Sequence, residues 1–453
     1  MNKIVSLAKR RGFIFPGSEI YGGLANSWDY GPLGTELKNN IKNLWWERYV
    51  QRRKDIVGID AAVIMNPKVW EASGHTKEFN DPLIECKKCH ERFRADELLK
   101  EGDWKKEKTF LDTLSEADRE KHLTKLFGDC PSCGAKDNFT SPREFTLMFK
   151  TFLGPAHSDK SVVYLRPETA QGMFVDFKNV LTTSRLNIPF GIAQIGRAFR
   201  NEITPGNFIF RTREFEQMEI EYFIKKDDWE KYFEYWQKEM KEWMDAVGVD
   251  GKKIHEREVG EDERAHYSKR TIDFDFDFPF GRKELYGLAY RTDFDLRNHA
   301  ESSGENLKYK DTETGEEFFP HVIEPTWGVD RTVLAVLASS YREDGERVVL
   351  SIKPRMAPYK AAIFPLLANK PQLVELAQKI YDDLQKNFMV AWDDRGNIGK
   401  RYYSQDEIGT PYCITIDFDS LENKDVTVRD RDTTKQERVK ISELKSFLEE
   451  RVK

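Results

Sequence analysis

The clearest alternation of apolar and charged residues lies between residues 199 and 223. An apolar run ends at Arg200 and Glu202, a polar turn follows at 204–207, and apolar and charged residues then alternate from Phe215 to Tyr222. The turn contains Pro, Gly and Asn, which favour tight turns because Pro fixes φ and the other two tolerate positive φ. The pattern predicts a β-hairpin with a long, charged connection. Such a ribbon is often simply solvated, but its guanidinium groups could also hold a polyanion, because they pair with phosphate in bidentate fashion.

Helical periodicity marks two other long segments. Apolar residues recur at helical spacing in residues 34–51, which predicts an amphipathic helix, and a strand ending at Pro67 is expected after it. Residues 227–247 carry an aromatic stripe at helical spacing, and such a stripe is more often core than cofactor contact. Further strands are expected at 143–149, 162–165, 271–278 and 283–293, with a short helix at 170–180.

The pattern changes after Arg355. Strand-like and helix-like stretches alternate from there to the C-terminus, which closes with two strands and a helix. This alternation predicts a separate α/β domain with a mixed sheet. We therefore expect two domains, residues 1–355 and 356–453. Insertions in the first are expected at about 85–140 and 226–270.

The composition is that of a water-exposed protein with sizeable cores. The 453 residues suffice for two or three domains, 39% are hydrophobic, and mean hydropathy is −0.67. No apolar run approaches the roughly 18 to 20 residues that span a bilayer, and residues 1–11 lack a signal-peptide pattern. We expect a cytoplasmic protein with no membrane partner. The net charge of −6 argues against general electrostatic binding of nucleic acid, so any RNA contact must use local basic patches.

Four of the five cysteines form two CxxC pairs. Cys86 and Cys89 make the first pair, and Cys130 and Cys133 make the second. Paired thiolates are typical of a structural zinc site, although about 40 residues separate the pairs, more than in a compact zinc ribbon. A disulfide is disfavoured in a reducing cytoplasm. We predict that the four sulfurs bind one Zn²⁺ and that Cys413, in an apolar run, is a buried small residue.

Three strings in order carry a family resemblance: residues 34–67, residues 200–215, and the sequence GVDR at 328–331 opening an apolar helix. They resemble the three signature motifs of class II aminoacyl-tRNA synthetases. Two more strings, LRPETAQGMF at 165–174 and WDYGPLG at 28–34, are similar to the homodimeric glycyl-tRNA synthetases. The resemblance runs from about Arg11 to the C-terminus.

The resemblance implies both a fold and a reaction. The expected fold is an α+β class II catalytic domain on an antiparallel sheet, with a zinc-knuckle insertion, followed by an α/β anticodon-binding domain. The implied enzyme is a homodimer, paired through the helix at 34–51, that activates glycine with ATP to glycyl-adenylate and transfers it to the 3′ end of tRNA(Gly). One alternative is a non-enzymatic accessory or nucleic-acid-binding subunit, but such relatives lose the ATP-binding arginines. Another is a synthetase for histidine, proline or threonine, against which the string RPETAQG argues.

The ATP site implied by the resemblance lies in the second and third motifs. Arg200 would contact the α-phosphate and Arg331 the adenine and γ-phosphate, and these two are the expected catalytic residues. Glu284 would hold Mg²⁺, which bridges phosphate oxygens. The expected ATP-binding residues are Arg200, Asn201, Glu202, Phe210, Arg211, Thr212, Arg213, Glu214, Phe215, Glu284, Leu285, Gly328, Val329, Asp330 and Arg331.

Glycine offers only an ammonium and a carboxylate, so its pocket must exclude a side chain rather than recognise one. Glu168, Glu219 and Glu324 would surround the ammonium, and Arg291 would hold the carboxylate, by resemblance; the alternative is that these glutamates only pair with nearby arginines. The family most often has Ser where this chain has Thr326, which keeps the hydroxyl and adds a methyl. The expected glycine-binding residues are Arg94, Glu168, Phe215, Glu216, Gln217, Met218, Glu219, Arg291, Glu324, Pro325, Thr326, Trp327 and Gly328.

Overall fold

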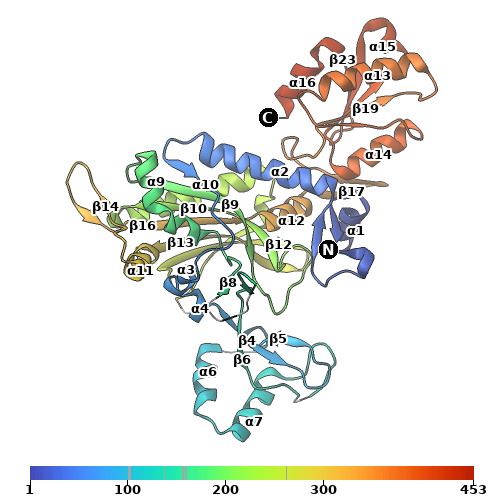
Figure 1. Ribbon diagram of the computed structural model, residues 1–453. Helices are drawn as coiled ribbons and strands as arrows, with labels where there is room; N and C mark the ends of the chain where they lie inside the picture. Colours follow the sequence, from blue (N-terminus) through green and yellow to red (C-terminus); the bar gives the residue numbers. More distant parts are fainter. Residues whose placement is uncertain (100–103, 137, 156–157, 159–160, 262, 453) are drawn as a thin grey trace.

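A seven-stranded sheet forms the centre of the larger part of the molecule (Figure 1). The structure is a computed structural model and describes residues 1–99, 104–136, 138–155, 158, 161–261 and 263–452. The strand order is β11-β12-β13-β16-β10-β9-β3, and all neighbours are antiparallel except β9 and β3. The strands are β3 (Ile56–Gly58), β9 (Phe190–Phe199), β10 (Glu214–Ile224), β11 (Ile254–Glu258), β12 (Arg270–Phe278), β13 (Gly281–Thr292) and β16 (His321–Gly328).

The hairpin expected at residues 199–223 is confirmed as β9 and β10. The two strands pair without interruption from Glu214↔Phe199 to Phe223↔Phe190. Side chains on a strand point alternately to its two faces. Met218 and Ile220 therefore enter the large hydrophobic core, whereas Glu219 lies on the opposite face. The charged connection after β9 reaches over that opposite face.

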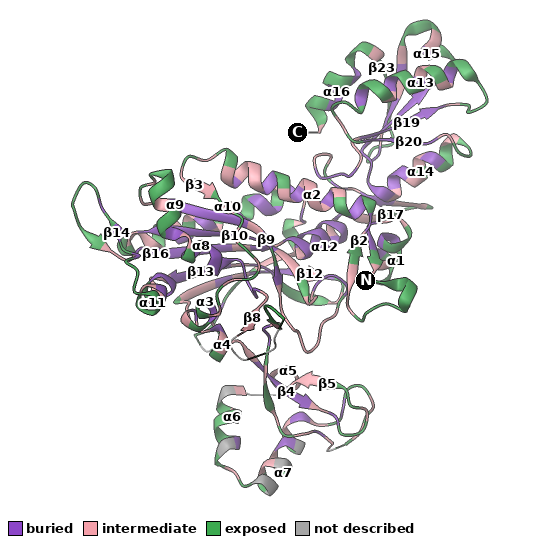
Figure 2. Cartoon of the chain, viewed as in Figure 1, coloured by how far each residue is buried: buried purple, intermediate pink, exposed green. Residues whose placement is uncertain are grey.

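Helices cover both faces of this sheet and bury it (Figure 2). One face packs against α10 (Trp229–Val247) and α12 (Val329–Ser340), and α2 (Pro32–Trp46) packs on α12. The other face packs against α8 (Ala170–Val175), α9 (Phe177–Ser184) and α11 (Phe294–Ser303). The aromatic stripe of α10 is core, as predicted: the segment expected as an insertion contributes Phe233, Trp236, Met240 and Trp243 to the large cluster.

Shorter elements surround the sheet. The N-terminus forms one helix and a two-stranded ribbon, and three more small antiparallel ribbons lie at the periphery. Their bounds are α1 (Asn2–Arg10), β1 (Ile14–Pro16), β2 (Trp28–Tyr30), α3 (Pro67–Ala72), α4 (His75–Glu78), β7 (Lys150–Phe152), β8 (Val162–Tyr164), β14 (Tyr309–Lys310), β15 (Glu317–Phe318), β17 (Tyr341–Asp344) and β18 (Arg347–Leu350).

The cysteine-containing segment projects away from the sheet as a unit with its own small core (Figure 1). Its three strands lie in the order β5-β4-β6, and helices complete it. They are β4 (Asn80–Glu85), β5 (Arg92–Arg94), α5 (Ala95–Leu98), α6 (Trp104–Thr113), α7 (Glu116–Phe127) and β6 (Arg143–Thr146).

The C-terminal segment forms a second, mixed sheet in the order β20-β19-β21-β22-β23, with hydrophobic clusters separate from those of the large sheet. β19 is parallel to β20 and β21, and the rest are antiparallel, as the α/β alternation predicted. The elements are β19 (Ala361–Pro365), α13 (Pro371–Leu384), β20 (Val390–Trp392), α14 (Ile398–Ile408), β21 (Tyr412–Ile416), α15 (Phe418–Asn423), β22 (Asp425–Asp430), β23 (Gln436–Lys440) and α16 (Leu444–Arg451). Cys413 is buried there, as expected.

The strand expected to end at Pro67 was wrong. The place beside β9 is taken earlier in the chain by β3, and the segment before Pro67 makes only an isolated bridge, Ile64↔Leu165. Pro67 instead begins α3, where its missing N–H costs nothing, and the Asn66 side chain caps that helix by accepting from the Lys68 N–H. The preceding helix agrees with the prediction, since α2 continues as a π-helical turn over Glu47–Gln51.

Candidate active site

A cavity of about 340 Å³ opens on the face of the large sheet that carries Glu219. Strands β10, β13 and β16, the start of α12 and the loop before β12 form its walls. Most of the predicted residues line it together: Glu168, Arg200, Glu202, Phe210, Arg211, Thr212, Phe215, Glu216, Gln217, Glu219, Glu284, Leu285, Glu324, Thr326, Gly328, Asp330 and Arg331. Residues of the second and third motifs, more than a hundred positions apart, therefore meet in one place.

The other predicted residues lie elsewhere among the described residues. Met218, Trp327 and Val329 are buried in the large core, and Pro325 is buried on β16 between two cavity residues. Arg213 and Glu214 line a neighbouring groove beside α2, and Asn201 donates its backbone N–H to Leu147. Arg94 lies at the end of β5, where it pairs with Asp81 at 3.1 Å and Asp96 at 2.6 Å. Arg291 is buried behind the cavity wall.

Glu168 and Glu219 are buried carboxylates that are held by hydrogen bonds. Glu168 lies 3.2 Å from His75 Nε2 and accepts from Gln171 at 3.0 Å. Burial opposes its charge, but His75 and Arg291 outweigh that effect and hold the pKa of Glu168 well below its usual range. Glu219 accepts from Gln217 at 2.8 Å and from the Thr169 hydroxyl and backbone N–H.

Arg291 is the buried cation beside these carboxylates. It lies where the register between β13 and β16 shifts. Its guanidinium donates a hydrogen bond to Glu324 at 2.7 Å and two to Asp295, each at 2.9 Å. The Tyr267 ring centroid lies 3.6 Å from the guanidinium carbon. Burial works against its charge, but Asp295 and Glu324 more than compensate and raise the pKa of Arg291 above its ordinary value. The arginine thus orients Glu324, and its contact with a substrate carboxylate stays a prediction.

Planar groups hold the arginines at the other end of the cavity. The Arg200 guanidinium lies 5.3 Å from the Phe79 ring and 5.2 Å from the Phe215 ring, and its Nε donates to the Pro167 carbonyl at 3.0 Å. Arg331 lies 4.4 Å from the Phe210 ring and pairs with Glu284 at 3.2 Å. Cation–π contacts of this kind fix a guanidinium while leaving its other N–H groups free to donate. Both arginines are therefore preorganised for an anion.

The cysteine-containing unit touches this site. Glu97, on α5, pairs with Arg211 at 2.8 Å. Thr204, in the same connection, lies 3.4 Å from Glu97 through its hydroxyl. The projecting unit therefore contacts the β9–β10 connection through an exposed ion pair and an exposed hydrogen bond, both made by Glu97.

Sequence reasoning missed one wall of the cavity. Tyr267, Arg264 and Asp273 line it from the loop before β12 and from β12 itself. Burial and the neighbouring Glu284 raise the pKa of Asp273 to about 7. The strand expected at 271–278 contains Asp273, but nothing in the sequence showed that this residue lies beside Glu284.

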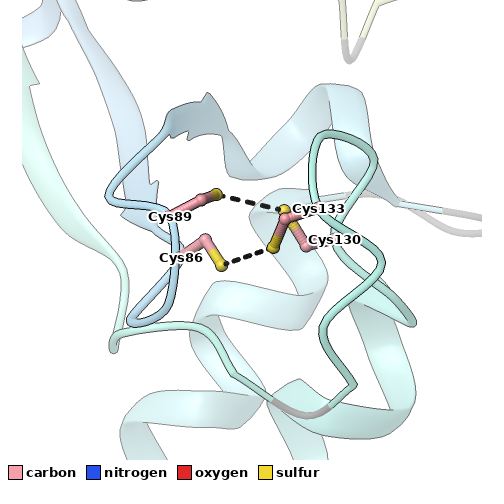
Figure 3. A group of neighbouring side chains, drawn as sticks. All are labelled: Cys86, Cys89, Cys130 and Cys133. Atoms are coloured by element: carbon pink, nitrogen blue, oxygen red, sulfur yellow. Dashed lines mark hydrogen bonds between the residues drawn. The ribbon is translucent and has the colours of Figure 1, made fainter.

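The four cysteines of the two CxxC pairs converge (Figure 3). Their Sγ atoms all lie within 4.8 Å of one another, and Cys86–Cys133 and Cys89–Cys130 are each separated by 3.7 Å. Four sulfurs around one Zn²⁺ at about 2.3 Å in tetrahedral geometry lie about 3.8 Å apart, so the spacing fits zinc. None of the four forms a disulfide.

Among the described residues, no helix is long and apolar enough to cross a membrane.

Comparisons with known proteins agree with this geometry. Residues 152–340 match the tRNA synthetase class II core domain (G, H, P, S and T), and residues 360–451 match the anticodon binding domain. The glycine--tRNA ligase of Alkaliphilus oremlandii is 53% identical over 459 residues, covering 100% of this chain and 98% of that protein. Those of Geobacillus thermodenitrificans and Caldanaerobacter subterraneus are also 53% identical, covering 100% of this chain and 97% and 98% of theirs. The similarity spans the full length of the chain, and the chain belongs to the glycine--tRNA ligase family of class II aminoacyl-tRNA synthetases.

Proposed function

We propose that this chain activates glycine with ATP and transfers it to the 3′ end of tRNA(Gly). The observation that carries the proposal is a single cavity with preorganised arginines at one end and buried carboxylates at the other. An amino acid bound with its ammonium among Glu168, Glu219 and Glu324 would direct its carboxylate toward Arg200. The non-enzymatic alternative is not supported, because Arg200, Arg211 and Arg331 are all present in the cavity.

The chain's own residues would act by positioning and electrostatics. Arg200 and Arg331 would neutralise charge that develops on the phosphates as the glycine carboxylate attacks the α-phosphorus and pyrophosphate leaves, and Phe215 would stack on the adenine. Glu284, with Asp273 beside it, offers the oxygen ligands that Mg²⁺ prefers, and would hold an ion that supplies positive charge to the phosphates. The acidic end would hold the ammonium and leave no space for a side chain. The other expected residues that line the cavity keep the roles in ATP and glycine binding that the resemblance implies.

Amino-acid-dependent pyrophosphate exchange tests this function. With ATP and each of the twenty amino acids in turn, only glycine should support exchange above background. Exchange with another amino acid, or with none while the protein is folded, would contradict the proposal.

Zinc at the four cysteines is part of the same proposal. Protein purified without added zinc should contain about one Zn²⁺ per chain, because four thiolates at tetrahedral spacing bind it tightly. Cys130→Ser should lower the zinc content at least severalfold, whereas the control Cys413→Ser, in the second sheet, should keep it. Metal analysis showing no zinc in the unaltered protein, with all four thiols freely titratable, would disprove the site.

We also infer that residues 1–355 and 356–453 are two domains, the second serving tRNA binding. Support comes from the separate sheets and clusters and from the match of residues 360–451 to an anticodon-binding domain. A protein ending at residue 355 should retain glycine-dependent exchange but lose most aminoacylation, about tenfold or more. Circular dichroism must show that the shortened chain is folded, because it loses the Arg347–Asp406 ion pair of 2.9 Å. Complete loss of exchange in a folded truncation would contradict this division.

A homodimer paired through α2 is proposed on the resemblance of this helix to the first motif, and sedimentation would test it. A cytoplasmic location is proposed because ATP and tRNA, the substrates inferred here, are found there.

A further inference from the structure

Glu221 is a buried carboxyl group that the proposed reaction does not use. Its side chain is 0% exposed, and neither carboxyl oxygen has a hydrogen-bond partner among the described residues. Buried polar groups are nearly always hydrogen-bonded, and buried charges are nearly always paired. Its position therefore requires an explanation.

The strand register places Glu221 directly behind the acidic end of the cavity. It lies two residues beyond Glu219 on the same face of β10. The pairs Glu219↔Thr326 and Tyr222↔Ile323 put it opposite Glu324 on β16. On its other side it meets an apolar cluster that includes Ile192 and Phe223. Glu221 thus separates the ammonium-binding carboxylates from hydrophobic core.

Every other carboxylate in this group has a partner. Glu168 contacts His75, Glu219 accepts from Thr169, and Glu324 and Asp295 bond Arg291. The charged groups that face Glu221 are Glu219 on its own strand, Glu324 on β16, Arg291 on β13 and Asp295 on α11. The nearby charged and titratable groups also include Glu168, which precedes α8, and His75 on α4. His299 on α11 is a further titratable group, and burial keeps its pKa below its ordinary value.

Charge balance decides the ionisation of Glu221. Glu324 and Asp295 already pair with the buried Arg291. A further negative charge at Glu221 would therefore lie in an apolar wall without hydrogen bonds. Burial and the neighbouring Glu324 raise the pKa of Glu221 well above its usual value. Burial and the missing hydrogen bonds both favour the neutral carboxylic acid over the carboxylate at Glu221. Burial also raises the pKa of Glu324, to about 8, but that carboxyl group bonds Arg291.

We propose that Glu221 is a positioning residue that holds a proton in the empty site and releases it to solvent when the glycine ammonium enters beside Glu219 and Glu324. This inference rests on the proposed function. The carboxylic acid becomes a carboxylate, one proton passes to the buffer, and glycine remains a zwitterion. The ammonium adds positive charge that the cluster of buried carboxylates lacks. The glycine carboxylate then lies toward Arg200. Glycine binding then becomes tighter as the pH rises.

Calorimetric titration of glycine into the full-length protein, without ATP, tests this linkage. Titrations in two buffers of different ionisation enthalpy should show about one proton released per glycine near neutral pH. The glycine Kd should fall as the pH rises above the ordinary carboxyl pKa, by at most about tenfold per pH unit for one released proton, over the pH range in which glycine itself does not titrate. A Kd that is constant over this range, or binding without proton release, would overturn the inference.

Three variants locate the proton. Glu221→Gln, which mimics the neutral acid, should bind glycine with no proton release and with a Kd independent of pH. Glu221→Asp should restore the release. Glu305→Gln, at an exposed residue after α11 that pairs with Lys178, should release the same proton as the unaltered protein. Undiminished release by Glu221→Gln would refute the assignment to Glu221, whereas absence of any glycine binding to the unaltered protein would refute the proposed function as well.

Discussion

Replacing Arg200 with lysine should lower the kcat of glycine-dependent pyrophosphate exchange by about 10²- to 10³-fold. The guanidinium is held between Phe79 and Phe215 and anchored on the Pro167 carbonyl, so its remaining N–H groups are aimed before substrate binds. Donors preorganised for charge that develops in the transition state contribute on this scale when removed singly. Lysine keeps the charge but loses the planar fork and the stacking. The effect should therefore fall mainly on kcat and less on the KM values.

Arg197→Lys provides the matched control. Arg197 belongs to β9, three residues before Arg200, but its side chain is largely exposed and pairs with Glu214. Exposed pairs contribute little, so kcat should stay within about twofold of the unaltered enzyme. A loss of less than tenfold in folded Arg200→Lys protein would show that Arg200 does not stabilise the transition state.

Replacing Glu168 with glutamine should raise the KM for glycine by about 10- to 100-fold and leave the KM for ATP nearly unchanged. Glutamine has the same shape and can still accept from Gln171, but it lacks the charge that the ammonium requires. Hydrogen bonds to charged groups contribute about 1.5–3 kcal/mol, which corresponds to this range at about 1.4 kcal/mol per factor of ten. Steady-state exchange with glycine and ATP varied in turn measures both constants.

The pH dependence of this effect has a definite sign. His75 and Arg291, acting against burial, hold the pKa of Glu168 well below its usual range, so the group is ionised throughout the assay range. Its charge would be lost only as the pH falls through that lowered pKa. The ratio of KM values between variant and unaltered enzyme should thus be similar at about pH 6.5 and 8, unlike the behaviour expected of Glu221.

Glu305→Gln is the control for Glu168→Gln. Glu305 lies after α11, exposed to solvent, and pairs with Lys178 at 2.8 Å. Neither KM should change. A normal glycine KM in folded Glu168→Gln protein would show that this carboxylate does not bind the ammonium.

Local patterns were sufficient for much of the fold. The β9–β10 hairpin, the aromatic helix α10, the strand β12 and the α/β order of the C-terminal segment all follow from spacing within one stretch of chain. The segment before Pro67 was the exception. Its apolar run favours a strand, but a strand needs a free neighbour, and β3 already occupies the edge beside β9. Pairing is a tertiary event, so local propensity could not decide it.

The chemical groups could be read from the sequence: the arginines of the β9–β10 connection, the CxxC pairs and the glutamates of three separate strings. Their surroundings depend on how distant segments pack together. The tertiary structure placed Asp273 beside Glu284, joined Glu97 to Arg211, and buried Glu221 opposite Glu324. The physical reason is that strand periodicity tells which face a side chain occupies, whereas its ionisation and function depend on the burial, charges and hydrogen-bond partners that distant segments bring to that face.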